Sequence, residues 1–512
     1  MRFGITTLGI SLASALLIVG VGCGDSGSGG AGGSGATGAA GGGDAGGAGG
    51  QGTGAAGAGG EAGSGGAGGS VPTTSCTFAD GASIPGDCGL FVKSDLGTGG
   101  DGSQADPFGN LNEALVHATE LVGTTNAAVN VYVCSNTIDI VGPIELTAGV
   151  HLVGAIDCAD GYRFSAASFN SKIVGSRDTP VVRVTGGALP NSLSNFDVRA
   201  VPGINPGSSS IGVLVNGGTL AVTGCHIEAS DGLPGTDGVD GIPGAAVADG
   251  EGGSFGDVPG MGGASSCGTA GGGGGGRATI WGSPINVAAS NGSPNQTNKG
   301  SSGTTCTNGQ PGADHGNDDG PNGLDGIGVG TIDENGYTGV SGTPGADGLN
   351  GAGGGGGGYT ETAVGLAAGG GGGAGACAGT AGTNGSYGGS SLGIVSVGAA
   401  LTVSDSSIVL GDGAPGGKRG VGGLASTRGV GAMGRIVQSG MMIVHGCPGG
   451  DGGAAGDGGF GGAGSGGHSV GIAYQGSAPV VTTVDVTLGA PGMAGSGGAA
   501  SSGVAQNTLL FP

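Results

Sequence analysis

The residues best suited to chemistry in this chain are its carboxylates. The chain has 36 Asp and Glu against 13 Lys and Arg, which gives a formal net charge of −23. This balance disfavours nucleic acid as a partner, because phosphate groups require a basic face. Most of the acids lie in glycine-rich stretches. Asp197 and Asp405 lie on expected strands instead, and we assign them to an outward face or a solvated turn.

The acidic stretch 314–325 (DHGNDDGPNGLD) is the best candidate for a cation site. Its carboxylates are hard oxygen ligands of the kind that Ca²⁺ prefers: Asp314, Asp318, Asp319 and Asp325. The spacing matches neither an EF-hand loop nor the repeat of calcium-binding β-rolls. We therefore favour a solvated loop over a calcium site, and we expect no other metal and no cofactor.

Catalysis on polysaccharides would require carboxylates that converge at a defined separation. Few acids lie on strand-like segments, few basic residues are available to bind acidic sugars, and Trp281 is the only tryptophan. We expect a protein that is not an enzyme. A polysaccharide lyase or glycoside hydrolase is the alternative, and an acidic cluster on adjacent strands would favour it.

The N-terminus has the pattern of an export signal. Arg2 supplies positive charge, residues 5–21 are apolar, and Cys23 follows directly. This pattern resembles a bacterial lipoprotein signal peptide, in which the cysteine is lipidated and becomes the mature N-terminus. The resemblance implies a signal peptide over 1–22, a membrane anchor at Cys23 and, from Gly24, an outer-membrane or cell-surface location. An ordinary secretory signal and an uncleaved anchor remain alternatives.

The cysteines suit an exported chain, because disulfides form in oxidising compartments. Nine of the ten remain when Cys23 is set aside, so at least one is free or pairs between chains. We expect three disulfides: Cys76–Cys88, Cys134–Cys158 and Cys267–Cys306. No Cys-x-x-Cys motif occurs, which disfavours zinc and thioredoxin-like redox chemistry.

An internal repeat organises the rest of the chain. The stretch 212–235 recurs without a gap at 393–416, 181 residues later, and more loosely from Gly471. Apolar residues two positions apart indicate short strands, and recurrence indicates stacked repeats. Because closure entropy grows slowly with loop length, we expect the first two copies to lie side by side. We expect a further repeat at 435–445 and an apolar tail at 509–511 that covers the C-terminal end.

The first folded part combines a strand at 90–93, a loop with Pro107-Phe108, a helix capped by Asn110 with Glu113 in a capping box, and a Val-Tyr-Val strand at 131–133. This order resembles the N-terminal end of right-handed parallel β-helix proteins of the pectin-lyase-like kind. The resemblance covers about 70 residues, and its motifs end with the Gly-Val-His-Leu-Val-Gly stretch at 149–154. It implies an all-β fold, a right-handed parallel β-helix whose N-terminal end is covered by the helix.

Glycine-rich segments separate these parts. Residues 23–75 form an expected disordered tether of Gly, Ala and Ser after the lipid anchor. Residues 232–390 form a glycine-rich (PGRS-like) insertion with weak strands, between β-helix parts at 76–231 and 391–512. Its Gly-x-y tracts are too short for collagen. They are either extended, polyproline-II-like segments that pack closely or disordered loops.

These observations predict a cell-surface lipoprotein that displays glycine-rich loops for adhesion, matrix or envelope architecture. The expected partners are the membrane, through the lipid on Cys23, and extracellular glycans or matrix. The alternative is a β-helix protein that binds or degrades an extracellular polysaccharide.

Overall fold

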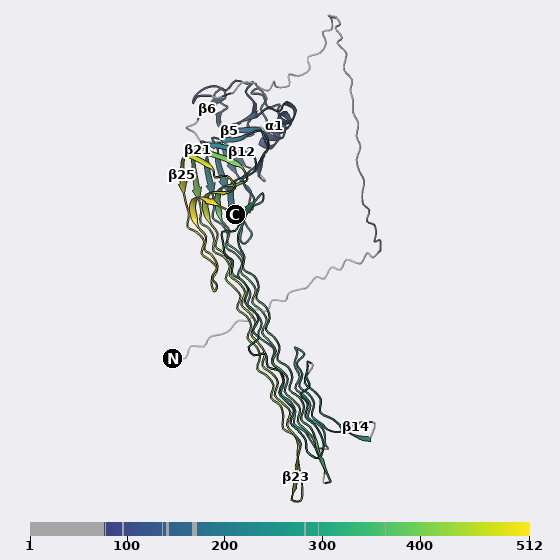
Figure 1. Ribbon diagram of the computed structural model, residues 1–512. Helices are drawn as coiled ribbons and strands as arrows, with labels where there is room; N and C mark the ends of the chain where they lie inside the picture. Colours follow the sequence, from purple (N-terminus) through teal and green to yellow (C-terminus); the bar gives the residue numbers. More distant parts are fainter. Residues whose placement is uncertain are drawn as a thin grey trace, which may run out of the picture. The chain divides into compact units, whose positions relative to one another are not determined.

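The computed structural model describes residues 76–512, apart from 77, 95–96, 136, 140–142, 166–170, 256, 281–282, 295 and 364. The expected signal peptide (1–22), lipid anchor (Cys23) and tether (23–75) lie outside the described residues. The described residues all belong to one compact unit. Within this unit, a sheet body continues into a bundle of glycine-rich segments (Figure 1).

The sheet body is all-β, with one helix among the described residues. Neighbours along its larger, twelve-stranded sheet are β1 (Leu90–Val92), β2 (Val129–Cys134), β5 (Val150–Asp157), β9 (Asn191–Ser194), β12 (Thr219–Thr223), β21 (Ala400–Leu410), β13 (His226–Ala229), β10 (Asp197–Ala200), β7 (Lys172–Val174) and β3 (Thr137–Asp139). Outside this order, β25 (Val480–Thr487) pairs with β21 and β6 (Arg163–Phe164) pairs with β5. The smaller sheet contains β26 (Ala505–Leu510), β24 (Ser469–Gln475), β20 (Ser391–Val397), β11 (Ser210–Asn216), β8 (Val182–Thr185) and β4 (Ile144–Leu146).

The repeat copies stack in register, as expected. β12 pairs in parallel with β21 so that Val222 faces Val403, and β21 pairs in parallel with β25. The two halves of β21 pair with β12 and β13, with a bend at Asp405, so the larger sheet curls. Val222 and Val403 are both fully buried. The scattered Val, Ile and Leu residues thus form one apolar column.

Helix α1 (Leu111–Thr125) packs against one end of this column. The Asn110 side chain caps it by accepting a hydrogen bond from the Asn112 N–H (2.8 Å). Its buried face is apolar: Leu111, Ala114, Leu115 and Ala118. The expected capping box is wrong in one respect. Glu113 accepts a hydrogen bond from the Gly99 N–H (3.1 Å) and so ties the helix to the preceding loop.

The glycine-rich segments are ordered and form what we call the glycine bundle. It comprises segments without helix or strand at 232–250, 259–275, 288–302, 307–326, 340–358, 368–389, 411–434, 446–467 and 489–503. Along the segment 235–244, every third residue donates its N–H to one neighbouring segment: Gly235, Gly238 and Gly241 donate to the carbonyls of Pro415, Lys418 and Val421. A three-residue repeat is that of polyproline II. Of the two interpretations of these segments, close packing is therefore correct.

Glycine is needed here because neighbouring backbones approach too closely for a Cβ atom. A Cβ at Gly461 would lie 1.9 Å from the Thr383 carbonyl oxygen, and one at Gly462 would lie 1.8 Å from that of Leu324. These two glycines face two different segments. The inner segment 446–467 accordingly has two glycines in most triplets, whereas 232–244, at the edge, has one.

Four antiparallel hairpins interrupt the bundle: β14–β15 (Gly276–Ile280, Ser283–Val287), β16–β17 (Thr331–Asp333, Gly336–Thr338), β18–β19 (Thr360–Thr362, Gly365–Ala367) and β22–β23 (Ile436–Ser439, Met442–His445). The expected repeat at 435–445 is therefore wrong, because β22 and β23 pair with each other. β16–β17 packs on the smaller sheet, whereas the other three contact one another at the end of the bundle far from the sheet body (Figure 1). We call these three the distal hairpins.

The tail at 509–511 covers the C-terminal edge of the smaller sheet, as expected, but not that of the larger sheet. β26 adds to the smaller sheet beside β24, and the buried Phe511 ring lies edge-on to Tyr337 and His468. The tail thereby covers the outer face of the smaller sheet.

The disulfides follow the spatial order of the segments. Cys76–Cys88 and Cys134–Cys158 are the pairs that we expected. The expected Cys267–Cys306 pair is wrong, because Cys267 pairs with Cys377 and Cys306 pairs with Cys447. Each of these cysteines lies beside its partner's segment: Thr269 and Gly375 are hydrogen-bonded near the first pair, and Gly309 and Pro448 near the second.

Candidate functional site

The four candidate calcium ligands do not converge. Asp314 and Asp325 bind Ala454 and Ala463 of the neighbouring extended segment, and these are nine residues apart, which at about 3.1 Å per residue separates the two carboxylates by about 28 Å. Asp319 and Asp325 accept hydrogen bonds from the N–H groups of Asp457 and Ala463 (both 2.8 Å), and Asp314 accepts one from Ala454. Asp318 is hydrogen-bonded to His315 (2.7 Å). Among the described residues, no group of three or more His, Cys, Asp or Glu could hold a metal ion.

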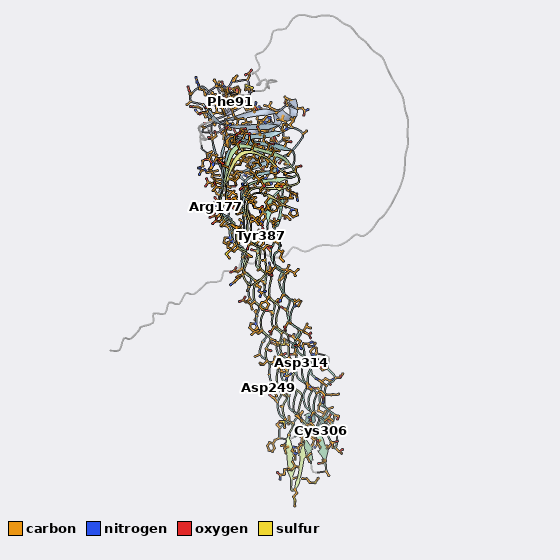
Figure 2. The ribbon with its side chains drawn as sticks, turned by 60° about the vertical axis from the view of Figure 1, so that its left-hand side comes forward. Phe91, Arg177, Asp249, Cys306, Asp314 and Tyr387 are labelled. Carbon is orange, nitrogen blue, oxygen red and sulfur yellow. A yellow bond between two sulfur atoms is a disulfide. The ribbon has the colours of Figure 1, made fainter. Side chains whose placement is uncertain are left out.

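These aspartates belong to a recurrent arrangement in the bundle. Each Asp-Gly pair forms two hydrogen bonds with one residue of the next segment, one through the glycine N–H and one through the aspartate carboxylate. The Gly241 N–H donates to the Val421 carbonyl (2.7 Å), while the Val421 N–H donates to Asp240 Oδ1 (2.8 Å). Asp237-Gly238 holds Lys418 in the same way. The stretches that carry Asp249 and Asp314 lie along the bundle (Figure 2). The acids of the glycine-rich tracts are therefore structural hydrogen-bond acceptors.

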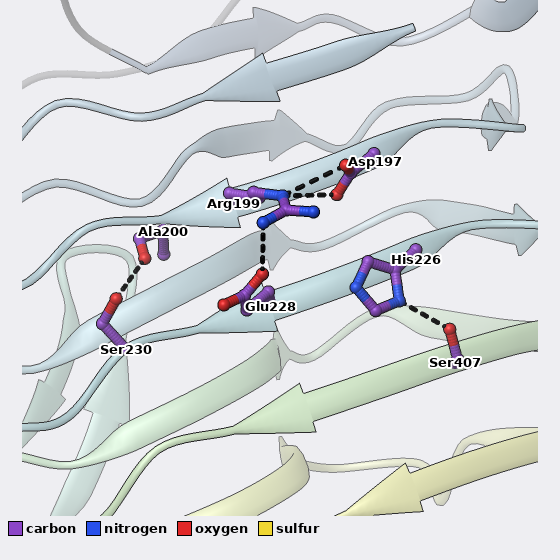
Figure 3. A network of polar contacts seen from close by, with 7 residues as sticks. All are labelled: Asp197, Arg199, Ala200, His226, Glu228, Ser230 and Ser407. Carbon is purple, nitrogen blue, oxygen red and sulfur yellow. Dashed lines mark hydrogen bonds and ion pairs between the residues drawn. The ribbon is translucent and has the colours of Figure 1, made fainter. Parts of the chain in front are cut away.

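A charged cluster lies on the outer face of the larger sheet (Figure 3). Arg199 Nε donates to Asp197 Oδ1 (3.0 Å), and Arg199 Nη1 lies 2.9 Å from Glu228 Oε2 on the neighbouring strand. His226 is hydrogen-bonded to Ser407 (2.7 Å). The carboxylates of β10 and β13 do approach each other, but the guanidinium lies between them. Of the two expected positions for Asp197, the outward face of a strand is correct and the solvated turn is wrong, because its side chain is buried against Arg199.

The ion pairs of this charged cluster link the neighbouring strands β10 and β13. The Arg199–Glu228 pair is 40% exposed on both sides, so it contributes only about 0–1 kcal/mol. Both carboxylates are already bound by the same cation. A glycosidase pair would instead need room for a sugar or a water between its carboxyl groups. The geometry therefore supports a role in holding β10 to β13.

A polar pocket of about 280 Å³ lies where the bundle meets the sheet body, beside Tyr387 (Figure 2). Its other walls include Asp178, Asn205, Asn335 and Tyr337. Burial raises the pKa of the Asp178 carboxyl, but hydrogen bonds from Ser208, Ile204 and Asn205 outweigh it and lower this pKa overall. The carboxylate thus fixes the loop that forms one wall. Tyrosine, amide and carboxylate groups therefore line one small pocket.

The distal hairpins present the most exposed apolar side chains. Met441, at the turn between β22 and β23, is fully exposed, and Met442 and Ile443 are more than half exposed. Phe255 is 90% exposed, and the Arg435 guanidinium lies 4.8 Å from the centre of its ring. Hairpin turns normally carry Gly, Asn or Asp. A run of methionines there has no role in packing within the described residues.

The distal end is also covalently braced. Cys306–Cys447 joins the loop before 307–326 to the segment that leaves β23, and Cys306 lies near the distal hairpins (Figure 2). Arg435 pairs with Asp257 (3.2 Å) across the same region. The exposed hairpins are thus held on a rigid base.

Within the described part of the chain, one cysteine forms no disulfide. Cys225 is buried in the apolar column, where burial raises the pKa of its thiol to about 11. A thiol that stays protonated at neutral pH is a poor nucleophile. The odd cysteine expected from the count is therefore Cys225, and it packs as a small apolar residue.

The described residues contain no helix with the length and apolar character needed to cross a membrane. No protein-family model matches the chain, and neither curated proteins nor solved structures show a match. Any assignment of function must therefore start from the geometry described above.

Proposed function

We propose that this chain is an exported, lipid-anchored cell-surface protein that displays its distal hairpins on a rigid glycine bundle and does not act as an enzyme. The hydrogen-bonded bundle is the observation that carries the proposal. At about 3.1 Å per residue, the segment 411–435 between β21 and β22 extends about 75 Å. Such a spacer holds a small exposed surface far from the sheet body.

The sheet body supports a finer assignment. We propose that it is a right-handed parallel β-helix of the pectin-lyase-like kind, with α1 covering its N-terminal end. Successive repeat copies pair in parallel on both sheets, as in β11–β20–β24 and β12–β21–β25. The first copy has three strands, and in the later copies β21 and β25 each take the place of the second and third strands, so the copies stack as in a solenoid.

The anchor is proposed from the sequence around Cys23, and the disulfides are compatible with it. Four disulfides are expected in an oxidising compartment and not in the cytosol. In this proposal, Cys23 carries the lipid, residues 24–75 form the tether, and the location is the outer membrane or the cell surface.

A labelling experiment in intact cells tests display. Ser439 is exposed at the end of β22, next to the turn into β23, whereas Ser406 is buried in β21. We expect Ser439→Cys to react with a membrane-impermeant maleimide on whole cells, and the matched control Ser406→Cys to remain unlabelled. Labelling of Ser439→Cys only after lysis would contradict surface display. Mass spectrometry of the mature N-terminus tests lipidation, which Cys23→Ser should abolish.

The second candidate function is binding of an extracellular polysaccharide, and the pocket beside Tyr387 favours it. Calorimetry with a panel of neutral and acidic glycans tests this candidate. We expect binding, if it occurs here, to be lost in Tyr387→Ala and retained in Tyr474→Ala, a tyrosine that does not line the pocket. Turnover of any glycan in the panel would contradict the non-enzymatic proposal.

A further inference from the structure

The β22–β23 hairpin has an apolar tip that nothing in the described part of the chain covers. Met441, in its turn, is fully exposed, and Met442 and Ile443 are 56% and 55% exposed. At the base of the same hairpin, the centre of the exposed Phe255 ring lies 4.8 Å from the Arg435 guanidinium. A side chain as exposed as Met441 lines no groove, so the tip projects from the molecule.

The charged side chains beside this tip are paired. Arg435 directly precedes β22 and pairs with Asp257 (3.2 Å). Arg277, in β14, pairs with Glu361 in β18 (3.3 Å). The stretch 436–445, which forms β22, its turn and β23, contains no Lys, Arg, Asp or Glu. The tip itself is therefore uncharged, and these neighbouring charges neutralise each other.

The distal end has no net charge, although the chain as a whole is acidic. The stretches 251–310, 355–368 and 430–448, which carry the distal hairpins, contain as many acids as bases: Glu251, Asp257 and Glu361 against Arg277, Lys299 and Arg435. The whole chain has a formal net charge of −23. Electrostatic repulsion from the rest of the chain is screened beyond about 8 Å at physiological salt. The distal end can therefore approach a surface without net charge.

The tip can also leave water at little cost to its backbone. β22 and β23 pair from Ile436 with His445 to Ser439 with Met442, so the groups between the strands are hydrogen-bonded. The outer edges of a two-stranded hairpin keep unpaired groups, which must stay hydrated. Only the turn can therefore enter an apolar medium. The Cys306–Cys447 disulfide holds the chain where it leaves β23.

We infer that the tip of β22–β23 inserts into the interfacial layer of a zwitterionic lipid surface. This inference rests on the proposed display function and names the class of partner. Methionine side chains are flexible and adaptable, so Met441 and Met442 suit a fluid acyl layer that has no fixed shape. A protein partner would have to immobilise them, at a cost in conformational entropy. Insertion at a lipid interface gains instead from the apolar area that it buries.

Fluorescence quenching in vesicles tests the inference on the full chain. Ser439→Cys carries an environment-sensitive label, and the vesicles are phosphatidylcholine with or without spin-labelled phosphatidylcholine. Attachment through the N-terminal segment is the same in all variants, whereas the label reports only the tip. We expect quenching that persists in about 0.5 M salt, which screens charge. A label at the exposed Thr185→Cys in β8 should not be quenched beyond the background of a chain without an added cysteine.

Substitution of the methionines separates their effect from that of the label. In the chain labelled at residue 439, the double change Met441→Ser and Met442→Ser should lower the ratio of inserted to free tips at least tenfold. The matched control Met493→Ser, at a position 75% exposed in segment 489–503, should leave this ratio unchanged. Circular dichroism establishes that each variant folds, because all three positions are exposed and none contributes to a core.

Several results would overturn the inference: no quenching at residue 439, undiminished quenching in the double variant, or equal quenching at residue 185. Insertion that requires phosphatidylserine would also overturn it, since the tip would then act through charge. Maleimide labelling of Ser439→Cys on whole cells tests display independently of lipid. A chain that is labelled on cells but not quenched in vesicles would retain the display function and lose the lipid partner in favour of a protein.

Discussion

The sheet body and the glycine bundle both have buried interiors, but different interactions hold the two interiors together. In the sheet body, large apolar side chains such as Leu193 and Phe196 fill a narrow column and are fully buried. In the bundle, segments such as 351–358 are buried just as completely but have almost no side chains to bury. There, backbone hydrogen bonds between closely spaced segments replace side-chain packing as the source of cohesion.

This difference teaches that burial alone does not define a hydrophobic core. The sheet body gains free energy from apolar area removed from water. The bundle gains it from satisfied backbone groups and from dispersion between closely packed main chains. Smaller side chains should therefore destabilise the sheet body most, whereas larger side chains should destabilise the bundle most.

Truncation of a large residue should be most damaging in the sheet body. Leu193 is fully buried, so Leu193→Ala should lower the free energy of unfolding by about 4 kcal/mol, through lost burial and a residual cavity. Leu324→Ala, in the bundle at a position 74% exposed, should change it by less than about 0.5 kcal/mol. Chemical denaturation monitored by far-UV spectra measures both. Equal losses would remove the distinction between the regions.

Enlargement of a glycine should be most damaging in the bundle. A methyl group at Gly462 would meet the Leu324 carbonyl oxygen at 1.8 Å, so Gly462→Ala should cost about 3 kcal/mol. Gly123, in helix α1, has no atom within 4 Å of its Cβ position. Gly123→Ala should therefore stabilise the chain by about 0.5–1 kcal/mol, because alanine favours helix. Melting curves that move in the same direction for both variants would contradict this contrast.

The aspartates of the bundle should act through hydrogen bonding and not through charge. Asp240→Ala removes the acceptor for the Val421 N–H and should cost about 1 kcal/mol. Asp240→Asn keeps an acceptor oxygen and should be nearly neutral. Asn322 already plays the same role for the Phe460 N–H (2.8 Å). Faster hydrogen exchange at Val421 in the alanine variant, but not in the asparagine variant, would establish this; equal exchange in both would refute it.

The junction of the two regions should respond to pH. His468 is buried, accepts a hydrogen bond from the Val504 N–H at Nδ1 (3.0 Å), and contacts the Val329 carbonyl through Nε2 (2.8 Å). Burial lowers the pKa of this imidazole. Its contribution to stability is therefore fully present above the ordinary histidine pKa of about 6.5 and is lost as the pH falls below it.

Thermal unfolding at pH 7.0 and pH 5.5 measures this effect. The wild-type chain should melt at a lower temperature at pH 5.5, and His468→Gln should show a smaller difference between the two values. Some difference should persist, because burial also lowers the pKa of His151 in β5. An unchanged pH difference in His468→Gln would exclude this histidine as the source.

The sequence predicts the sheet body well because its signals are local. Alternating apolar residues locate β2, β4 and β7, and the 181-residue repeat predicts the pairing of β12 with β21. The β22–β23 hairpin was interpreted as a further repeat because a short apolar run does not identify its partner strand. The Ser439-Gly440 pair between its two apolar runs is the turn signal that indicates a hairpin.

The bundle was harder to predict because its contacts join residues far apart in sequence. Cys267 pairs with Cys377 only because segment 368–389 passes beside it, and disulfide connectivity cannot be read from spacing. The acidic stretch at 314–325 suggested a cation site because carboxylates that are close in sequence look close in space. In the folded chain, the carboxylates instead accept hydrogen bonds from different residues along the neighbouring segment 446–467. Asp237 and Asp240 precede their partners Lys418 and Val421 by 181 residues, which is the spacing of the internal repeat. The repeat therefore predicts which residues of the two segments are hydrogen-bonded.

Hydrogen exchange of individual backbone amides in segment 232–244 tests most directly whether the glycine-rich tracts form an ordered bundle. The Gly238 and Gly241 amides donate to Lys418 and Val421. They should be strongly protected, while the neighbouring Asp237 and Asp240 amides exchange faster and so give a three-residue period. Uniformly fast exchange along this segment, at the rate of an unstructured chain, would contradict the bundle and the display function proposed from it.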